Sequence, residues 1–150
     1  MDETARDLEE AATADAIQLL IDTAAIRRLL AGCCQTLDDG RFEEWGALYT
    51  EDCRFAVMGR RTQGRAEMRA FIEPFQTDEL RGKHMISEPR INLHGDDANA
   101  TTDFAFVGKD NKILQTGRYY DVLRRGADGW QVAGREIVFT GGEPIGLDDQ

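Results

Sequence analysis

The fold and the candidate chemistry both centre on the stretch Lys83-His-Met-Ile-Ser-Glu-Pro-Arg-Ile-Asn-Leu93. Alternate side chains of a strand point to the same face, so His84, Ile86 and Glu88 share one face here. His84 is one of two histidines in 150 residues, and histidine has the ordinary pKa nearest to neutral pH. The other, His94, precedes a turn and is expected on the surface. His84 is therefore the first candidate for proton transfer, with a packed or solvent-facing strand histidine as the alternative.

Further apolar runs follow this stretch, each separated from the next by turn-forming residues. They occupy residues 98–107, 113–124 and 130–139. The connecting segments are rich in glycine, aspartate and asparagine, which hairpin turns favour. The second half of the chain, from Lys83 to Phe139, is therefore predicted to form four long strands joined by hairpins.

The first half of the chain has a helical pattern instead. Apolar residues recur at three- and four-residue steps from Asp15 to Leu37, which predicts a long amphipathic helix. Asp15 is a candidate cap for its start, and Asp22 is a candidate cap for a second start if the helix is broken there. The turn residues Asp38-Asp-Gly40 are expected to end it.

Shorter elements complete this half. Helices are expected over residues 42–49 and 65–73, the second ending near Pro74, and a short apolar strand is expected over residues 53–58.

The two ends of the chain lack the patterns of the middle. Residues 1–14 are acidic and have no apolar stripe, so a frayed arm is expected. The tail, residues 141–150, has little to pack. The folded domain is accordingly assigned to residues 15–140.

Helices at the front and antiparallel strands behind indicate an α+β domain built on one sheet. Long strands twist, so a sheet wrapped on the long helix has a concave face, and a pocket between helix and sheet is the natural ligand site. The helix is expected to pack one apolar stripe against that face, made of Ile26, Leu29, Leu30, Cys33 and Leu37.

Composition excludes several classes of partner. The formal net charge is -10, and binding to nucleic acid or to an anionic membrane needs a basic patch that this sequence does not show. The first residues have no signal-peptide pattern, and no apolar run is long enough to span a bilayer. We expect a cytoplasmic protein whose partners are small molecules or other subunits.

The cysteines do not indicate a metal site. The three of them, Cys33, Cys34 and Cys53, are odd in number and do not combine with histidine at the spacing that zinc needs. They are expected to be reduced, mostly buried thiols. No metal and no cofactor are expected.

Several short motifs, taken in order, resemble the SnoaL-like branch of the nuclear transport factor 2-like superfamily. The resemblance covers residues 15–139, and each motif is weak alone while the order and spacing are specific. The motifs are Ile17-Gln-Leu-Leu-Ile-Asp-Thr-Ala-Ala-Ile26, Leu37-Asp-Asp-Gly40, Leu48-Tyr-Thr-Glu-Asp52, Gly64-Arg-Ala-Glu-Met-Arg69, Lys83-His-Met-Ile-Ser87, Gly117-Arg-Tyr-Tyr-Asp121 and Asp128-Gly-Trp130.

This resemblance implies a cone-shaped fold, in which a strongly bent mixed sheet is closed by helices around a deep pocket, assembled as homodimers or homotrimers. Within the branch, the chain is most similar to the scytalone dehydratase group. There, an aspartate at the end of the first helix and a histidine on a strand form a dyad, and Asp38 and His84 match these positions. The aspartate fixes the tautomer of the imidazole, which leaves its other nitrogen as a base. A turn residue that only ends the helix is the alternative for Asp38.

The chain departs from the scytalone dehydratase pattern where that enzyme holds its substrate carbonyl. The tyrosines of that group correspond here to Leu37 and Val57, and a second pocket histidine falls near Asp103. Scytalone itself is therefore not the expected substrate. The candidates for replacing these groups are Tyr119, Tyr120, Arg118, Glu88 and Asp103, with Ile86 beside His84 as a further lining residue.

The leading functional hypothesis is a cofactor-independent lyase or isomerase of the dehydratase type, acting on a small hydroxylated cyclic or aromatic compound. One alternative is a binding module without catalysis. Another is a structural subunit similar to the small subunit of ring-hydroxylating dioxygenases. Apolar residues on both faces of residues 104–107 and 137–139 predict that copies of the chain associate through the outer face of the sheet.

Overall fold

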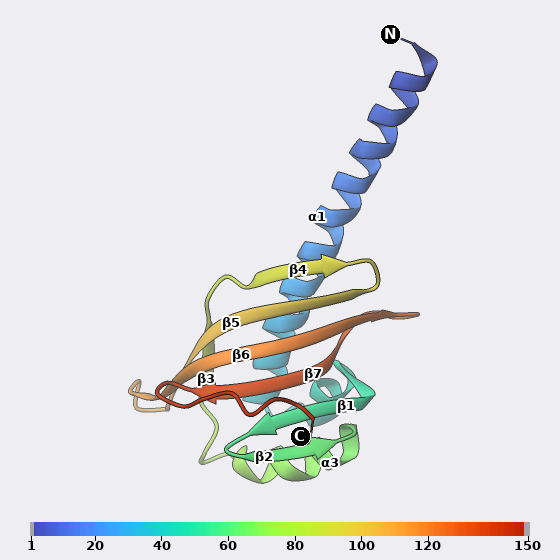
Figure 1. Cartoon of the computed structure of the whole chain (residues 1–150). Helices are drawn as coiled ribbons and strands as arrows, with labels where there is room; N and C mark the ends of the chain where they lie inside the picture. The colour runs from blue at the N-terminus through green and yellow to red at the C-terminus, as the bar shows by residue number, and fades with distance from the viewer. Residues whose placement is uncertain (1, 149–150) are drawn as a thin grey trace.

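The computed structural model describes residues 2–148, and Figure 1 shows its elements. The helices are α1 (Glu3–Asp38), α2 (Phe42–Ala47), α3 (Arg65–Ile72) and the short 3-10 helix η1 (Glu73–Phe75). The strands are β1 (Tyr49–Val57), β2 (Arg60–Gln63), β3 (Lys83–Ile86), β4 (Arg90–His94), β5 (Asp97–Val107), β6 (Ile113–Gly126) and β7 (Gly129–Phe139). No helix in this part of the chain is long and apolar enough to cross a membrane.

All strands belong to one mixed sheet, which confirms the predicted fold class. Its order is β2-β1-β7-β6-β5-β3, and β4 also pairs with β5. β1 runs parallel to β7, whereas the other pairs are antiparallel. The long central strands β5, β6 and β7 twist, and the C-terminal half of α1 lies across the concave face that results (Figure 1).

The apolar stripe of α1 faces the sheet, as predicted. Ile26, Leu29, Leu30 and Cys33 are buried in the main core, and Leu37 is half-buried against it. This packing removes the row of apolar side chains from water, which is the main stabilising contribution available to an amphipathic helix. It also fixes the end of α1, at Asp38, close to the sheet.

The predicted strand over residues 83–93 is two strands. β3 ends at Ile86 and β4 begins at Arg90, and each pairs with a different part of β5. Pro89 lies in the break, where a residue without a backbone N–H removes no ladder hydrogen bond. The alternation of faces therefore holds only as far as Ile86, and Glu88 falls outside it.

The long helix is continuous and begins earlier than expected. Asp2 caps it by accepting a hydrogen bond from the Thr4 backbone N–H at 3.0 Å, so neither Asp15 nor Asp22 marks a start. The expectation of a frayed arm is wrong for the described residues 3–14, which are helical. Alanine, leucine and glutamate, all strong helix formers, dominate this segment. Residue 1 lies outside the described part.

The tail also differs from expectation, because residues 145–148 are bound to the outer side of the sheet. Glu136 accepts hydrogen bonds from the backbone N–H groups of Ile145 and Gly146 at 2.7 and 3.1 Å. Arg61 donates to the carbonyl oxygens of the same two residues at 2.6 and 3.0 Å. Backbone recognition of this kind leaves no hydrophobic pattern in the tail from which it could be predicted. Residues 149 and 150 lie outside the described part.

Candidate active site

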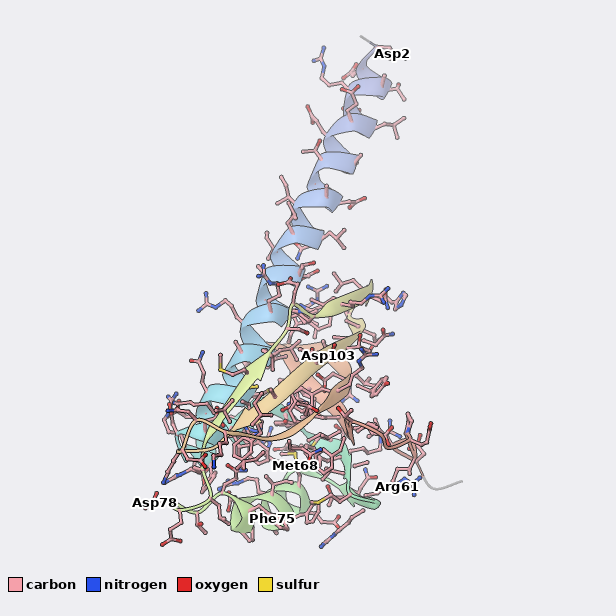
Figure 2. All side chains as sticks on the ribbon, turned by 90° about the vertical axis from the view of Figure 1, so that its left-hand side faces the viewer. Asp2, Arg61, Met68, Phe75, Asp78 and Asp103 are labelled. Atoms are coloured by element: carbon pink, nitrogen blue, oxygen red, sulfur yellow. The ribbon has the colours of Figure 1, made fainter. Side chains whose placement is uncertain are left out.

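A cavity of about 230 Å³ lies between the end of α1 and the concave face of the sheet. Its walls are mainly aromatic and aliphatic, and the polar side chains that reach it are few: Gln76, His84, Gln115 and Arg135, with the hydroxyl-bearing Tyr49 and Tyr119. Phe75, labelled in Figure 2 beside the lower edge of the domain, closes one side. Apolar walls with a few convergent polar groups are typical of small-molecule sites.

His84 and Asp38 meet at this cavity. The Nδ1 atom of His84 lies 2.5 Å from Oδ1 of Asp38, and the His84 backbone N–H donates to Oδ2 of the same carboxylate at 2.8 Å. The side chain of Asp38 is 3% exposed and that of His84 is 14% exposed, so the pair is shielded but open to the cavity. An ionised carboxylate only accepts hydrogen bonds, so Nδ1 is the donor in this contact, and in a neutral imidazole Nε2 can then act as a base.

The end of α1 explains how the carboxylate of Asp38 becomes available. Asp39 and Arg41 turn their backbone N–H groups back to the carbonyl oxygens of Gln35 and Thr36, at 3.0 and 2.9 Å. Gly40 permits this turn with a φ of 70°, a conformation that glycine adopts without steric cost. The residues after Asp38 therefore end the helix, and the Asp38 side chain is free to bind β3.

Aromatic rings hold the imidazole from its other sides. The His84 ring lies 4.7 Å from that of Phe106 and 6.3 Å from that of Phe104, measured between centroids. Phe104 in turn stacks on Tyr119 at 4.5 Å with an interplanar angle of 7°. These contacts restrict rotation of the histidine and place Tyr119 on the same wall of the cavity.

A buried ion pair that the sequence did not indicate forms a further part of the site. Arg135 donates from Nε and Nη2 to the two carboxylate oxygens of Asp121, at 2.7 and 3.0 Å. Arg135 is 4% exposed and Asp121 is 2% exposed. The guanidinium also lies over the Tyr119 ring at 4.1 Å. The pair places the Arg135 guanidinium at the wall of a mainly apolar cavity, with the Asp121 carboxylate as its counterion.

Burial and charge set the protonation of the groups around this pair. Burial raises the pKa of Tyr119 and of Tyr49, so both phenols stay neutral and keep a proton to donate. Burial opposes the charge of Arg135, but the Asp121 carboxylate outweighs it and raises the pKa of the guanidinium. Burial also raises the pKa of Cys34, which lines the cavity, to about 12, so this thiol is not a nucleophile near neutral pH.

Three of the predicted substrate-binding residues line the cavity: Leu37, Val57 and Tyr119. Ile86 is next to it, half-buried in the core that contains Phe104 and Tyr119, and does not reach the cavity.

Four other predicted residues lie away from the cavity, and these predictions are corrected. Arg118 and Tyr120 flank the inward-facing Tyr119 on β6, so the period of two turns them to the outer face. Asp103 has the same orientation on β5 and pairs with Arg118 at 2.6 Å; Figure 2 labels Asp103 on the sheet. Glu88 lies past the end of β3 and pairs with Arg27 at 3.1 Å, with both side chains more than half exposed.

The residues that were missed share one signal. Asp121 and Arg135 are charged residues at inward-facing positions of strands β6 and β7, where their neighbours are Tyr119, Leu123 and Ile137. They stand directly opposite one another in the register of the two strands. The Asp121–Arg135 pair could have been predicted only from the register of β6 and β7, and that register depends on a bulge near Val122.

Comparison with protein families finds a match to the SnoaL-like domain over residues 18–136. Comparison with curated proteins finds no match.

Solved structures with the same fold cover most of the chain. An NTF2-like protein with a cystatin-like fold from Novosphingobium aromaticivorans is 25% identical, with a TM-score of 0.76 over 87% of this chain and 90% of that chain. A protein of the same organism named "Putative Scytalone Dehydratase" is 22% identical, with a TM-score of 0.75 over 89% of this chain and 99% of that chain. ActVI-ORFA of Streptomyces coelicolor is 24% identical, with a TM-score of 0.68 over 78% of this chain and 96% of that chain.

Proposed function

The chain belongs to the SnoaL-like domain family, and on that premise we propose that it is a cofactor-independent lyase or isomerase of the dehydratase type. Its substrate is a small hydroxylated cyclic or aromatic compound, and His84 is the general base. The observation that carries the proposal is the 2.5 Å contact between His84 Nδ1 and Asp38 Oδ1 at the wall of the cavity. This contact turns Nε2 away from the carboxylate, and in the neutral imidazole it makes Nε2 the nitrogen that can accept a proton.

The dyad supplies the first step of an elimination. Nε2 of His84 accepts a proton from the carbon next to a ketone, and the electron pair of the broken C–H bond forms an enolate. The enolate then expels the hydroxyl group on the adjacent carbon. That group takes the proton back from His84 and leaves as water, so the dyad returns to its starting state.

Arg135 and Tyr119 provide the stabilisation that the enolate oxygen requires. Asp121 accepts from two N–H groups of Arg135, and no other protein group within residues 2–148 accepts from the rest. The Tyr119 phenol keeps its proton, because burial raises its pKa. Donors fixed in a water-poor site stabilise developing negative charge more strongly than water does. We infer that these groups replace the tyrosines whose positions Leu37 and Val57 occupy.

The cavity limits the size of the substrate. Its volume of about 230 Å³ is below the roughly 300–1,000 Å³ of sites that take drug-sized ligands. Aromatic side chains form most of its wall, and flat rings stack favourably on such surfaces. A single-ring β-hydroxy ketone therefore fits the site better than an extended polycyclic compound.

The test begins with small cyclic β-hydroxy ketones. Those that raise the unfolding temperature are assayed for loss of water by the ultraviolet absorbance of the enone product. His84→Ala should lower turnover by at least about a hundredfold, the lower end for general-base catalysis. His94→Ala is the matched control, because His94 is exposed at the end of β4 and outside the cavity. Its turnover should equal that of the wild type.

The alternatives predict different results. A binding module would give a shift of the unfolding temperature with ligand but no product. Normal turnover by His84→Ala would show that the reaction uses another base and would overturn the proposed mechanism.

A further inference from the structure

The N-terminal part of α1 has no packing partner in the described structure. All side chains from Asp2 to Ile21 are exposed except that of Ala5, which is half-buried. Figure 1 and Figure 2 show this segment projecting beyond the sheet as a single rod. Most helical stability in proteins comes from packing of an amphipathic face, which this segment lacks within the described structure. The segment therefore presents a surface suited to a partner.

One face of α1 carries a heptad pattern that runs from this segment onto the domain. The side chains recur at alternating steps of four and three residues, which is the spacing of helices that pack in pairs. They are Thr13, Ile17, Leu20, Ala24, Arg27 and Ala31. Ile17 and Leu20 are 52% and 69% exposed. At about 100° per residue, this face lies opposite the buried stripe that contains Ile26 and Leu30, so the domain's own core does not account for it.

The C-terminal half of this face borders an open groove on the domain. Ala24, Arg27, Arg28 and Ala31 form one wall, and residues 86–89 form the other, around a volume of about 440 Å³. The two alanines leave room for a second helix to approach α1 closely.

Charge determines which partner fits and in which direction. The first ten residues carry five acidic side chains and one arginine, whereas Arg27 and Arg28 lie at the other end of the face. Arg27 pairs with Glu88 at 3.1 Å, and no ion pair of Arg28 is found within residues 2–148. A parallel copy of α1 would place the acidic first turns of the two helices side by side, and the arginines of one copy beside those of the other. An antiparallel copy would place Glu9 and Glu10 beside the two arginines.

We propose that two copies of the chain associate through antiparallel pairing of α1. The two-fold axis passes between residues 18 and 19, which places Ile17 of one copy beside the partner's Leu20. By the same symmetry, Thr13 faces the partner's Ala24, and Glu10 faces the partner's Arg27. Each contact occurs twice, as a two-fold interface requires. The acidic first turns of each helix then occupy the groove on the other domain.

Adjacent leucines provide a matched test by sedimentation equilibrium. Leu20 lies on the proposed interface, whereas Leu19 points to the other side of α1 and is also mostly exposed, at 54%. The mass of the wild-type assembly should be halved by Leu20→Glu and unchanged by Leu19→Glu. A monomeric wild type, or variants that have equal mass, would overturn the proposal. Circular dichroism of each variant shows whether the fold is kept.

Disulfide trapping tests the direction of pairing. A mixture of Glu10→Cys and Arg27→Cys proteins should form a mixed disulfide faster than either protein forms a disulfide with itself. The native cysteines are all buried, and the untreated wild type measures their background reaction. Faster trapping of Glu10→Cys with itself would indicate parallel helices and would contradict the antiparallel arrangement.

Discussion

At the scale of single residues, the site depends on where two pairs of side chains are placed. Asp38 is the last residue of α1 and His84 is the second residue of β3, so the helix end and the strand hold the dyad from both sides. Asp121 and Arg135 are held by the register of β6 and β7. In the proposed mechanism, the first pair supplies a base, and Arg135 of the second pair supplies hydrogen-bond donors while Asp121 balances its charge.

The buried pair should show strong energetic coupling in urea unfolding. Arg135→Met leaves the Asp121 carboxylate buried without a partner, so we expect a loss of about 3–5 kcal/mol in the free energy of unfolding. Adding Asp121→Leu removes the unpaired charge and should recover most of that loss. If the double variant is as unstable as Arg135→Met, the loss of stability does not come from an unpaired Asp121 carboxylate, and the expected coupling is absent.

The resemblance to a known family predicted the dyad but not the pair. A helix end and a strand histidine occur in a fixed order along the chain, so Asp38 and His84 could be matched by position. Asp121 and Arg135 form a contact only because β6 and β7 pair with a bulge, and no local pattern gives that register. The incorrect choices of Arg118 and Tyr120 have a related cause, since Tyr119 faces inward and its neighbours must face outward.

At the scale of elements, α1 is fixed to the sheet at both ends of its buried half. Asp38 binds β3, and Asp22 accepts from the Trp130 indole N–H at 3.2 Å and from Arg125. The sequence suggested Asp22 as the cap of a second helix, because aspartate is a preferred N-cap residue. The sequence alone does not distinguish such a cap from an aspartate that binds another element. Only its contacts with β6 and β7 identify it as an anchor.

Because Asp22 holds α1 to the sheet as an ionised carboxylate, its contribution to the free energy of unfolding should depend on pH. Burial favours the neutral form of Asp22, but hydrogen bonds from Arg125, Trp130 and Gln18 outweigh it and lower its pKa. A lowered pKa stabilises the fold above the unfolded value of 3.8, and that contribution is lost as the pH falls through the folded value. Asp22→Asn should therefore cost about 1–3 kcal/mol at neutral pH and progressively less below pH 3.8. Asp15→Asn, on the exposed part of α1, is the control, and an Asp22→Asn cost that does not change with pH would contradict the assignment.

At the scale of the whole molecule, α1 has two separate faces. Its buried stripe lines the cavity through Cys33 and Leu37, and its opposite face is the one that we propose pairs with a second copy. Association through the outer face of the sheet also remains a prediction, and exposed Met85, Leu114, Tyr120 and Val122 are candidates for that contact. The antiparallel pairing of α1 uses neither the cavity nor this outer face. Leu20→Glu should therefore change the mass of the assembly and leave the dyad intact.

The most direct test of the central claim is the tautomer of His84, because the proposed base exists only if Nδ1 holds the proton. Nitrogen-15 spectra of the two histidines, recorded at a pH where the signals no longer change, measure this without a substrate. His84 should show a protonated Nδ1 and a bare Nε2, and Asp38→Asn should abolish this bias. The exposed His94 provides the reference for an unconstrained imidazole. A proton on Nε2 of His84 in the wild type would contradict the account.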